Sequence, residues 1–263
     1  MSNLLVIPAR YESSRFPGKP LAFIEDSNGK KISLIEKTWQ LALQLNFFDK
    51  KIIATDDIRI KEFCEGFGAE VCMTSNNLRN GSERVAETLN LQDKSYKIIV
   101  NLQGDAPLTP IWVIEGLGKE LEKNNYQVAT PVLKCEQGTL NKFISDKKAG
   151  RIGATTVVFD KNLKALYFSK ELIPYINQNN LKKNLSIVYH HIGVYAYKSQ
   201  ALKSYIKFPQ GSLEKQEGLE QLRFIENDIA IKCVISSLKG NEFWELNNPS
   251  DIPIIEKIIK INK

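Results

Sequence analysis

The sequence has few of the residues that stabilise small secreted or metal-bound proteins. Its four cysteines lie far apart and form no Cys-x-x-Cys pair; they are Cys64, Cys72, Cys135 and Cys233. Such spacing predicts neither a disulfide framework nor a structural zinc site. The two histidines, His190 and His191, are adjacent. Neighbouring strand residues point to opposite faces, so the two imidazoles cannot both bind one metal ion. Because the cysteines are few and widely spaced, we expect the protein to reside in a thiol-reducing compartment, the cytoplasm.

Long hydrophobic runs are also missing. No apolar segment approaches the ~20 residues that a membrane-spanning helix needs. The first eleven residues lack both the basic region and the apolar core of a secretory signal. With 43% hydrophobic and 25% charged residues, the composition is that of a globular protein. It excludes a disordered chain, a coiled-coil rod and a collagen-like repeat, and we expect no membrane partner.

The chain carries an excess of positive charge, with a formal net charge of +6. Such an excess is compatible with a nucleic acid, an anionic membrane face or a polyanionic small substrate as partner. The lysines are spread along the chain, and no block of five or more like charges occurs. A nucleic-acid-binding protein, which needs clustered basic and aromatic residues, is therefore the weaker alternative. The net charge alone does not decide between the partners.

Short apolar segments alternate with amphipathic segments in the first half of the chain. The pattern predicts strands at 4–7, 51–54, 70–73 and 97–102, and helices at 33–47, 58–66, 82–90 and 111–122. This alternation predicts an α/β fold with a mixed, mostly parallel sheet flanked by helices. Ligands of such sheets bind beyond the carboxyl ends of the strands. The loops to consider are 8–20, 55–57, 74–81 and 103–107.

The second half is less regular. Strands are predicted at 127–133, 153–159, 187–197 and 229–236, a polar excursion at 138–150, and helices at 213–226 and 252–261. No clear linker separates two halves. We expect a single domain over residues 1–263, with a small β-rich insertion at about 125–200 that could serve as a dimerisation region.

The loop that follows the first strand concentrates positive charge. Residues 8–20 place Arg10, Arg15 and Lys19 around Gly18, Pro17 and Pro20. Three cations on a stiffened loop suit a triphosphate, and backbone N–H groups near Gly18 can add to the anion site. The loop is not a Walker A motif, since no Gly-Lys-Ser/Thr opens a helix. The alternative is a proline-rich surface loop with solvated cations.

Two further segments follow predicted strands. In the segment 103–107, Asp105 stands at the tip of a central strand, a common position for a magnesium ligand, although a Gly-Asp turn explains it equally well. In the segment 80–84, Gly81 and Ser82 fit a turn and a helix cap. Polar groups of that loop could also contact a base or a sugar.

Three segments of the second half carry polar residues whose spacing places them on one side of a strand, on one side of a helix or at the start of a helix. Strand parity places His191, Gly193 and Tyr195 on one face. Helical spacing places Glu220 and Gln221 on the same side as Glu217, and the nearby Gly218 indicates a close approach of another group. Asn247 and Asn248 precede the terminal helix, as a helix cap does.

Taken together, these segments resemble the 3-deoxy-manno-octulosonate (Kdo) cytidylyltransferase family. The family pattern PARYxSxRxPGKP is present at 8–20, and counterparts of its QGDEP, SGTER, HLGIYGY and LExxExLEQLR motifs follow at 103–107, 80–84, 191–197 and 213–223. The resemblance implies a nucleotidyltransferase-type fold and a Mg²⁺-dependent transfer of CMP from CTP to the anomeric hydroxyl of an acidic sugar, with release of pyrophosphate. It also implies a cytoplasmic homodimer that acts in lipopolysaccharide biosynthesis.

The resemblance assigns roles to individual residues. Arg10, Arg15 and Lys19 would hold the triphosphate, Asp105 and Asn247 the magnesium ion, and Arg10, Lys19 and Asp105 would form the catalytic set. The remaining nucleotide contacts would come from Pro8, Ala9, Ser82 and Gln103. The sugar would be surrounded by Gln103, Lys170, His191, Tyr195, Glu220 and Gln221.

The chain departs from the family pattern around the base and the sugar. Ser75, Asn77 and Leu78 replace a basic residue and an Asp-His pair, Lys170 replaces an arginine, Ala106 a glutamate and Asn247 an aspartate. We therefore hypothesise a divergent member. Its acceptor is Kdo or a related compound, such as an amino-Kdo, a nonulosonic acid or a phosphonate, and its donor is CTP or another nucleoside triphosphate.

Overall fold

The computed structural model describes residues 2–13, 16–150, 154–176, 187–246 and 248–261. Within these ranges one sheet of ten strands has the order β5-β4-β1-β6-β11-β7-β10-β8-β9, and β12 pairs with β7. The strands are β1 (Ser2–Pro8), β4 (Lys50–Thr55), β5 (Val71–Met73), β6 (Tyr96–Leu102), β7 (Val128–Lys134), β8 (Thr156–Phe159), β9 (Ala165–Ser169), β10 (Tyr189–His191), β11 (Val194–Lys198) and β12 (Ile231–Ile235).

The sheet is mixed. β5, β4, β1 and β6 pair in parallel, and β12 pairs in parallel with β7. β11 runs antiparallel between β6 and β7, and β10, β8 and β9 continue with antiparallel pairings. The predicted α/β class with a mixed sheet is confirmed. The carboxyl ends of β1 and β6, which are parallel neighbours, therefore open on the same edge of the sheet.

Helices cover both faces because side chains alternate along each strand. On β1, Leu4 and Val6 face α3 (Gly81–Asn90), α7 (Ser199–Tyr205) and α9 (Leu222–Glu226). Leu5 and Ile7 face α1 (Leu34–Leu43), α2 (Ile58–Gly66) and α4 (Ile111–Lys123). α8 (Ser212–Glu217) adjoins α9. The buried strand β1 thus has an apolar run rather than an alternating pattern.

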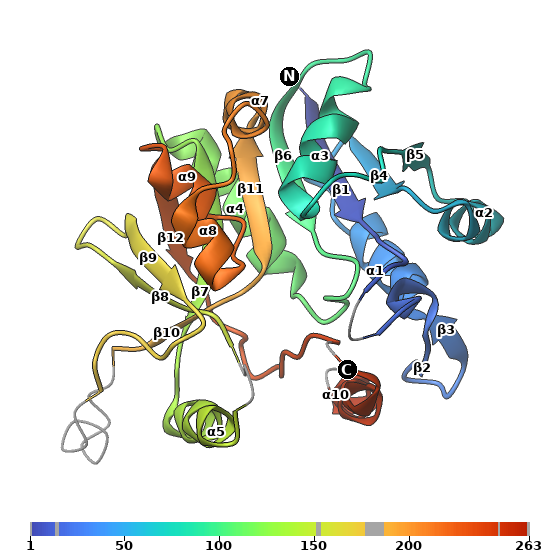
Figure 1. Ribbon diagram of the computed structural model, residues 1–263. Helices are drawn as coiled ribbons and strands as arrows, with labels where there is room; N and C mark the ends of the chain where they lie inside the picture. Colours follow the sequence, from blue (N-terminus) through green and yellow to red (C-terminus); the bar gives the residue numbers. More distant parts are fainter. Residues whose placement is uncertain (1, 14–15, 151–153, 177–186, 247, 262–263) are drawn as a thin grey trace.

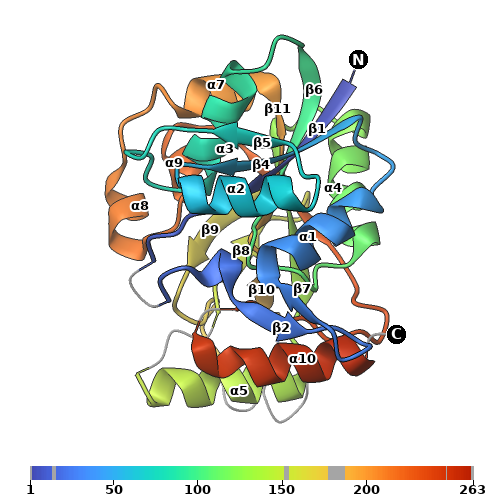
Figure 2. The ribbon, with the colours of Figure 1, turned by 90° about the vertical axis from the view of Figure 1, so that its right-hand side faces the viewer.

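The remaining elements lie towards the carboxyl-end edge of the sheet (Figures 1 and 2). They are η1 (Lys19–Leu21), β2 (Phe23–Glu25), β3 (Lys31–Ser33), α5 (Gln137–Lys148), η2 (Pro249–Asp251) and α10 (Ile252–Ile261). Ile255 and Ile259 of α10 pack with Ile24 and Ile32 of the β2–β3 hairpin. The end of the chain thereby returns to the loop that follows β1. Among the described helices, none has the length and apolarity to span a membrane.

Three sequence predictions of secondary structure are wrong in type or continuity. Residues 138–150, predicted as a polar excursion, lie largely within α5, because Leu140 and Phe143 pack against Val188. The predicted strand 187–197 is two strands, β10 and β11, which are interrupted at Ile192 and Gly193. Although the strand is interrupted, the rings of His191 and Tyr195 lie on the same face, with centroids 5.4 Å apart, as strand parity predicted.

The predicted helix 213–226 is likewise two short helices. Gly218 ends α8 in the left-handed conformation, with φ 61°, which glycine adopts without strain. The chain changes direction there before α9 begins at Leu222. The predicted common helix side of Glu217, Glu220 and Gln221 does not exist.

Candidate functional site

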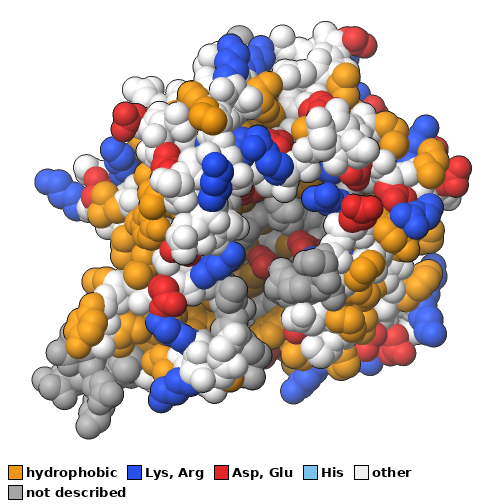
Figure 3. All heavy atoms as spheres, in the orientation of Figure 1, with side chains coloured by type: hydrophobic (Ala, Val, Ile, Leu, Met, Phe, Trp, Pro, Cys, Tyr) orange, Lys and Arg blue, Asp and Glu red, His pale blue; other side chains and the backbone are white. Residues whose placement is uncertain are grey.

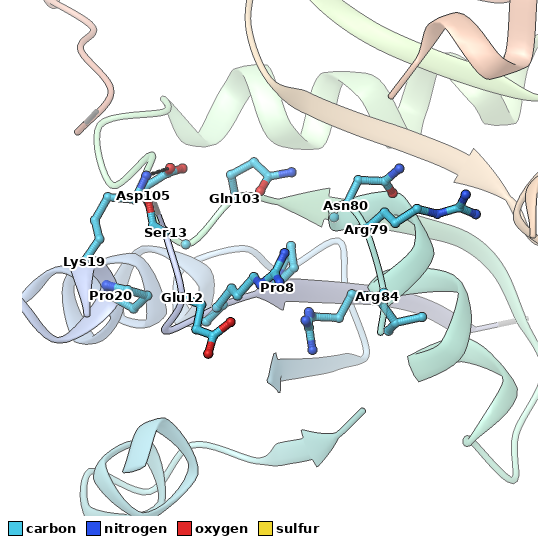
Figure 4. Close-up of a pocket in the computed structure, with 15 residues that line it drawn as sticks. Pro8, Glu12, Ser13, Lys19, Pro20, Arg79, Asn80, Arg84, Gln103 and Asp105 are labelled. Carbon is cyan, nitrogen blue, oxygen red and sulfur yellow. Dashed lines mark hydrogen bonds and ion pairs between the residues drawn. The ribbon is translucent and has the colours of Figure 1, made fainter. Parts of the chain in front are cut away.

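A pocket lies at the carboxyl ends of β1 and β6, beside the start of α3 (Figure 4). Residues of 8–13, 19–20, 78–84 and 103–105 line it. Three of the four loops selected from the sequence thus meet at one place. Figure 3 shows a hollow near the middle of the molecule, with basic and acidic side chains around it.

The loop after β1 supplies two of the cations of the pocket. Arg10, with an exposed side chain, and Lys19 both line it. The loop is closed by a hydrogen bond from the Gly18 N–H to the Tyr11 carbonyl, 2.8 Å long. The Arg59 guanidinium of α2 lies 3.4 Å from the centre of the Tyr11 ring. Arg15, the third predicted cation, lies outside the described residues.

Lys19 lies between two oxygen atoms at one end of the pocket. Its ammonium forms an ion pair with the Asp105 carboxylate (Figure 4) and donates a hydrogen bond, 3.1 Å long, to the Leu246 carbonyl. Carboxylate and carbonyl oxygens are also the ligands that Mg²⁺ prefers, usually with phosphate oxygens and water. The donor set therefore fits a magnesium ion that arrives with a nucleotide. Asn247, the other predicted ligand, lies outside the described residues.

The start of α3 forms the other end of the pocket. Asn80 caps the helix, because its Oδ1 accepts a hydrogen bond of 2.9 Å from the Glu83 N–H. A Cβ atom at Gly81 would lie 2.7 Å from Gln103 Nε2, so only glycine allows Gln103 this position. Gln103 in turn donates to Asn101 Oδ1 at 3.2 Å.

Ser82 does not have the predicted position. It is neither the cap of α3 nor among the residues that line the pocket. It is buried, and its hydroxyl is 2.7 Å from the Tyr197 hydroxyl in the interior. Its backbone N–H donates a hydrogen bond of 3.1 Å to Glu220 Oε2. Ser82 therefore connects the pocket to the turn between α8 and α9.

Glu220, Gln221 and Tyr195 come together beside this connection. Burial raises the pKa of Glu220 to about 7, although the hydrogen bond from the Ser82 N–H opposes the shift. The Tyr195 hydroxyl donates to Gln221 Oε1 at 3.0 Å, and burial raises the Tyr195 pKa. The Gln221 side-chain amide N–H₂ is buried and has no hydrogen-bond partner among the described residues. A buried donor without a protein partner is free to bond to a water molecule or to a ligand.

His191 and Lys170 lie further from the pocket and do not line it. His191 is buried, with Nε2 2.9 Å from Thr130 Oγ1 and its ring against Phe168. Burial lowers its pKa to about 3, so the imidazole is neutral. Lys170 donates its backbone N–H to Glu217 Oε2 at 2.9 Å, and its Nζ would be 2.9 Å from a Cβ at Gly218. The predicted close approach at Gly218 is thus made by Lys170.

Comparisons with known proteins identify the family of the chain. The family model for cytidylyltransferases matches residues 4–231. The chain belongs to the cytidylyltransferase family. It is 38% identical over 260 residues to a 3-deoxy-manno-octulosonate cytidylyltransferase of Maricaulis maris, with 98% of this chain and 97% of the relative covered. It is also 38% identical, over the full length of both chains, to an 8-amino-3,8-dideoxy-manno-octulosonate cytidylyltransferase of Shewanella pealeana.

A solved structure shows the same fold. The cytidylyltransferase chain matches a CMP:2-keto-3-deoxy-manno-octonic acid synthetase complexed with CTP, with a TM-score of 0.83 and 28% identity over all of both chains. The family that the sequence motifs indicated is therefore confirmed, as is the enzyme class, a nucleotidyltransferase.

Two buried residues at or beside the pocket of this cytidylyltransferase received no role from the sequence, although Arg84 ends the 80–84 motif. Arg84 lines the pocket floor, pairs with Asp56 at 3.2 Å and bonds to Thr74. Burial lowers the Arg84 pKa, against the effect of Asp56. Asn101 lies opposite Tyr195 across β6 and β11 and holds Gln103. The signal that could have revealed such residues is a polar side chain within a segment that is otherwise apolar enough to be buried.

Proposed function

We propose that this cytidylyltransferase transfers CMP from CTP to the anomeric hydroxyl of Kdo and releases pyrophosphate. The observation that carries the proposal is the convergence of Lys19 and Asp105 at one end of a pocket whose other end is formed by Gly81 and Gln103. The names of the two relatives give 3-deoxy-manno-octulosonate and its 8-amino derivative as their substrates. The solved structure is a synthetase in complex with CTP.

The basic loop would bind the triphosphate. Arg10 and Lys19 supply positive charge where an anionic nucleophile must approach an anionic phosphate, which is the main electrostatic barrier of the reaction. We extend this role to Arg15 as a prediction from the sequence. The cytosine ring would contact the backbone at Pro8 and Ala9 and the loop 78–81, which line the same pocket.

A magnesium ion would be held by Asp105, and by Asn247 as predicted from the sequence. When bound, it would neutralise phosphate charge and help to activate the acceptor hydroxyl. Before binding, Lys19 neutralises Asp105, and so it keeps a lone carboxylate from repelling the incoming nucleotide. Lys19 then has to exchange one anionic partner, Asp105, for another, the triphosphate.

The acceptor would occupy the side of Gln103 that faces Glu220 and Gln221. The buried amide of Gln221 is oriented by Tyr195 and offers two donors to sugar hydroxyls or to a carboxylate. The neutral His191 supports Tyr195 by ring packing at 5.4 Å between centroids. Lys170 would supply positive charge for the carboxylate of the sugar.

An 8-amino-Kdo is the second candidate acceptor. The Shewanella pealeana relative has the same 38% identity as the Maricaulis maris relative, so identity does not separate the two acceptors. The test is pyrophosphate release with Mg²⁺ across the four nucleoside triphosphates and a panel of Kdo, 8-amino-Kdo, nonulosonic acids and phosphonates. Release with CTP and Kdo is expected. Release only with UTP and a neutral sugar phosphate contradicts the proposal.

We also propose a cytoplasmic homodimer. Large apolar side chains of the 125–200 region are solvent-exposed in the single chain, with 91% of Tyr175, 66% of Ile187 and 54% of Leu166 accessible. Figure 3 shows hydrophobic side chains together over the β8 and β9 region. A second copy that covers them would remove apolar area from water. Light scattering at several protein concentrations should give twice the chain mass, and a monomer at every concentration contradicts the proposal.

A further inference from the structure

One arginine of α9 is completely buried between two carboxylates. Arg223 has no solvent-exposed side-chain surface, and its Nε and Nη2 each donate to Glu214 at 2.7 Å. Its Nη1 lies 2.9 Å from Glu83 Oε1 of α3. The guanidinium also lies 4.2 Å from the centre of the Tyr205 ring. A planar fork with two carboxylate partners is an arrangement that lysine cannot reproduce.

The partners of Arg223 belong to both sides of the site. Glu83 is in the first turn of α3 and binds Arg79, with its Oε1 3.0 Å from Arg79 Nε. Asn80, the cap of α3, donates to the Tyr205 hydroxyl at 3.0 Å and to Glu214 at 3.3 Å. Arg79 and Asn80 line the nucleotide pocket.

The same group of contacts reaches the acceptor side. The Tyr205 hydroxyl donates to the Glu220 carbonyl at 3.1 Å, and the Glu220 carboxylate accepts from the Ser82 N–H at 3.1 Å. Glu220 and Gln221 lie three and two residues before Arg223 in the chain, respectively. The pocket end of α3 and the turn between α8 and α9 are therefore joined on two sides, by Arg223 and by Glu220.

We propose that Arg223 is a positioning residue that sets the distance between the nucleotide and acceptor subsites of this enzyme. The inference rests on the proposed function, because it assigns the start of α3 to the nucleotide and the α8–α9 turn to the acceptor. Arg223 itself does not touch either substrate. It holds the two elements at one separation, and the attacking hydroxyl and the α-phosphate are then brought to reacting distance.

The charges explain why a single arginine has this effect. Glu83 and Glu214 both face Arg223, and Glu220 lies next to Glu214 along the same buried region. Although burial opposes it, hydrogen bonds from Arg79 and Arg223 lower the pKa of Glu83, which keeps it ionised. Without the guanidinium, buried carboxylates of α3 and α8 repel each other and the two elements separate.

The test compares Arg223→Lys, which keeps the charge and loses the fork, with the double variant Glu214→Gln/Arg223→Met, which removes one buried carboxylate together with the cation. The second variant keeps the test valid if the first folds poorly. CTP affinity is measured by calorimetry without acceptor, and KM is measured for CTP and for the acceptor. We expect CTP binding to weaken about fivefold or more and both KM values to rise.

A purely structural role would give a different result. Loss of folded protein lowers the apparent kcat but leaves CTP affinity and both KM values of the remaining folded enzyme unchanged. Lys215→Met, an exposed substitution on α8, is the matched control and should change none of them. If wild type binds CTP and both Arg223 variants bind it within twofold of wild type with unchanged KM values, the inference is overturned. If wild type does not bind CTP, the proposed function fails instead.

Discussion

The ammonium of Lys19 lies against the carboxylate of Asp105, although the two residues are 86 positions apart in the chain. One follows β1 and the other follows β6, and these strands are parallel neighbours in the sheet. The pair is only partly exposed, with 14% of the Lys19 and 28% of the Asp105 side chain accessible. A cation and a carboxylate that already attract each other can exchange partners when a magnesium–nucleotide complex arrives.

Asp105→Asn tests the carboxylate of this pair. The amide keeps the shape but loses the charge that a magnesium ion needs, so we expect turnover to fall by about 10²-fold or more. Pyrophosphate release measures the loss, and the thermal unfolding midpoint should stay within a few degrees of wild type. Turnover within a factor of three of wild type would remove Asp105 from the catalytic set.

Lys19→Met tests the cation. Because Lys19 is predicted to bind the triphosphate, affinity should fall more for CTP than for CMP, which has a single phosphate. We expect about a tenfold loss for CTP and little change for CMP, measured by calorimetry under identical salt conditions. Equal losses for both nucleotides would place Lys19 near the base or ribose instead.

Gly81→Ala tests the packing at the start of α3. The new Cβ would lie 2.7 Å from Gln103 Nε2, so Gln103 must move out of its position between pocket and acceptor side. We expect kcat/KM for the acceptor to fall by about tenfold or more. Gly116→Ala on α4 is the control, because a Cβ there meets nothing within 4 Å. Normal activity of Gly81→Ala would show that Gln103 has no role in placing the acceptor.

The raised pKa of Glu220 predicts that the stability of the protein depends on pH. Folding raises the pKa of Glu220 from 4.5 to about 7, so the folded protein favours the protonated carboxyl. The resulting stabilisation is fully present below pH 4.5 and is lost as the pH rises through 7. A shift of this size corresponds to about 3 kcal/mol, and partial exposure reduces the expected effect to about 2 kcal/mol. Relative to Glu220→Gln, wild type should lose stability between pH 5 and about 8.

Urea unfolding of wild type and Glu220→Gln at several pH values measures this difference. His191, whose pKa is lowered to about 3 by burial, acts in the opposite direction: its contribution is lost as pH falls from 6.5 through 3. Subtracting the variant curve from the wild-type curve cancels His191, which both proteins retain. A flat difference curve would show that Glu220 has an ordinary pKa in the folded protein.

Arg84→Met tests the buried arginine of the pocket floor. Its side chain is 3% exposed and pairs with Asp56, of which 13% is exposed. Removing one partner leaves a mostly buried carboxylate uncompensated, so we expect unfolding free energy to fall by about 3 kcal/mol. Lys119→Met removes an exposed partner of Glu115 and should change it by less than about 1 kcal/mol. Similar losses for both variants would mean that the Arg84–Asp56 pair is solvated.

Elements with strong local signals could be predicted from the sequence alone. The helix Ile58–Gly66 matches its prediction, and Ser33 caps α1 as expected, with its hydroxyl 3.2 Å from the Glu36 N–H. α1 ends at Leu43, earlier than predicted. The errors fall where tertiary contacts decide: α5 forms because two apolar side chains find a partner in Val188, and the helix break at Gly218 accompanies the approach of Lys170.

The sequence by itself determined which segments form the site. Motifs placed directly after parallel strands must meet at one edge of the sheet, so loops 8–20, 74–81 and 103–107 could be selected without coordinates, together with loop 55–57, which does not line the pocket. Only the tertiary structure decided what individual polar side chains do there. Ser82 is buried against Tyr197, Asn80 caps α3 in its place, and Arg223 joins α3 to α8. Buried polar groups must find partners wherever the fold provides them, and those partners are distant in the chain.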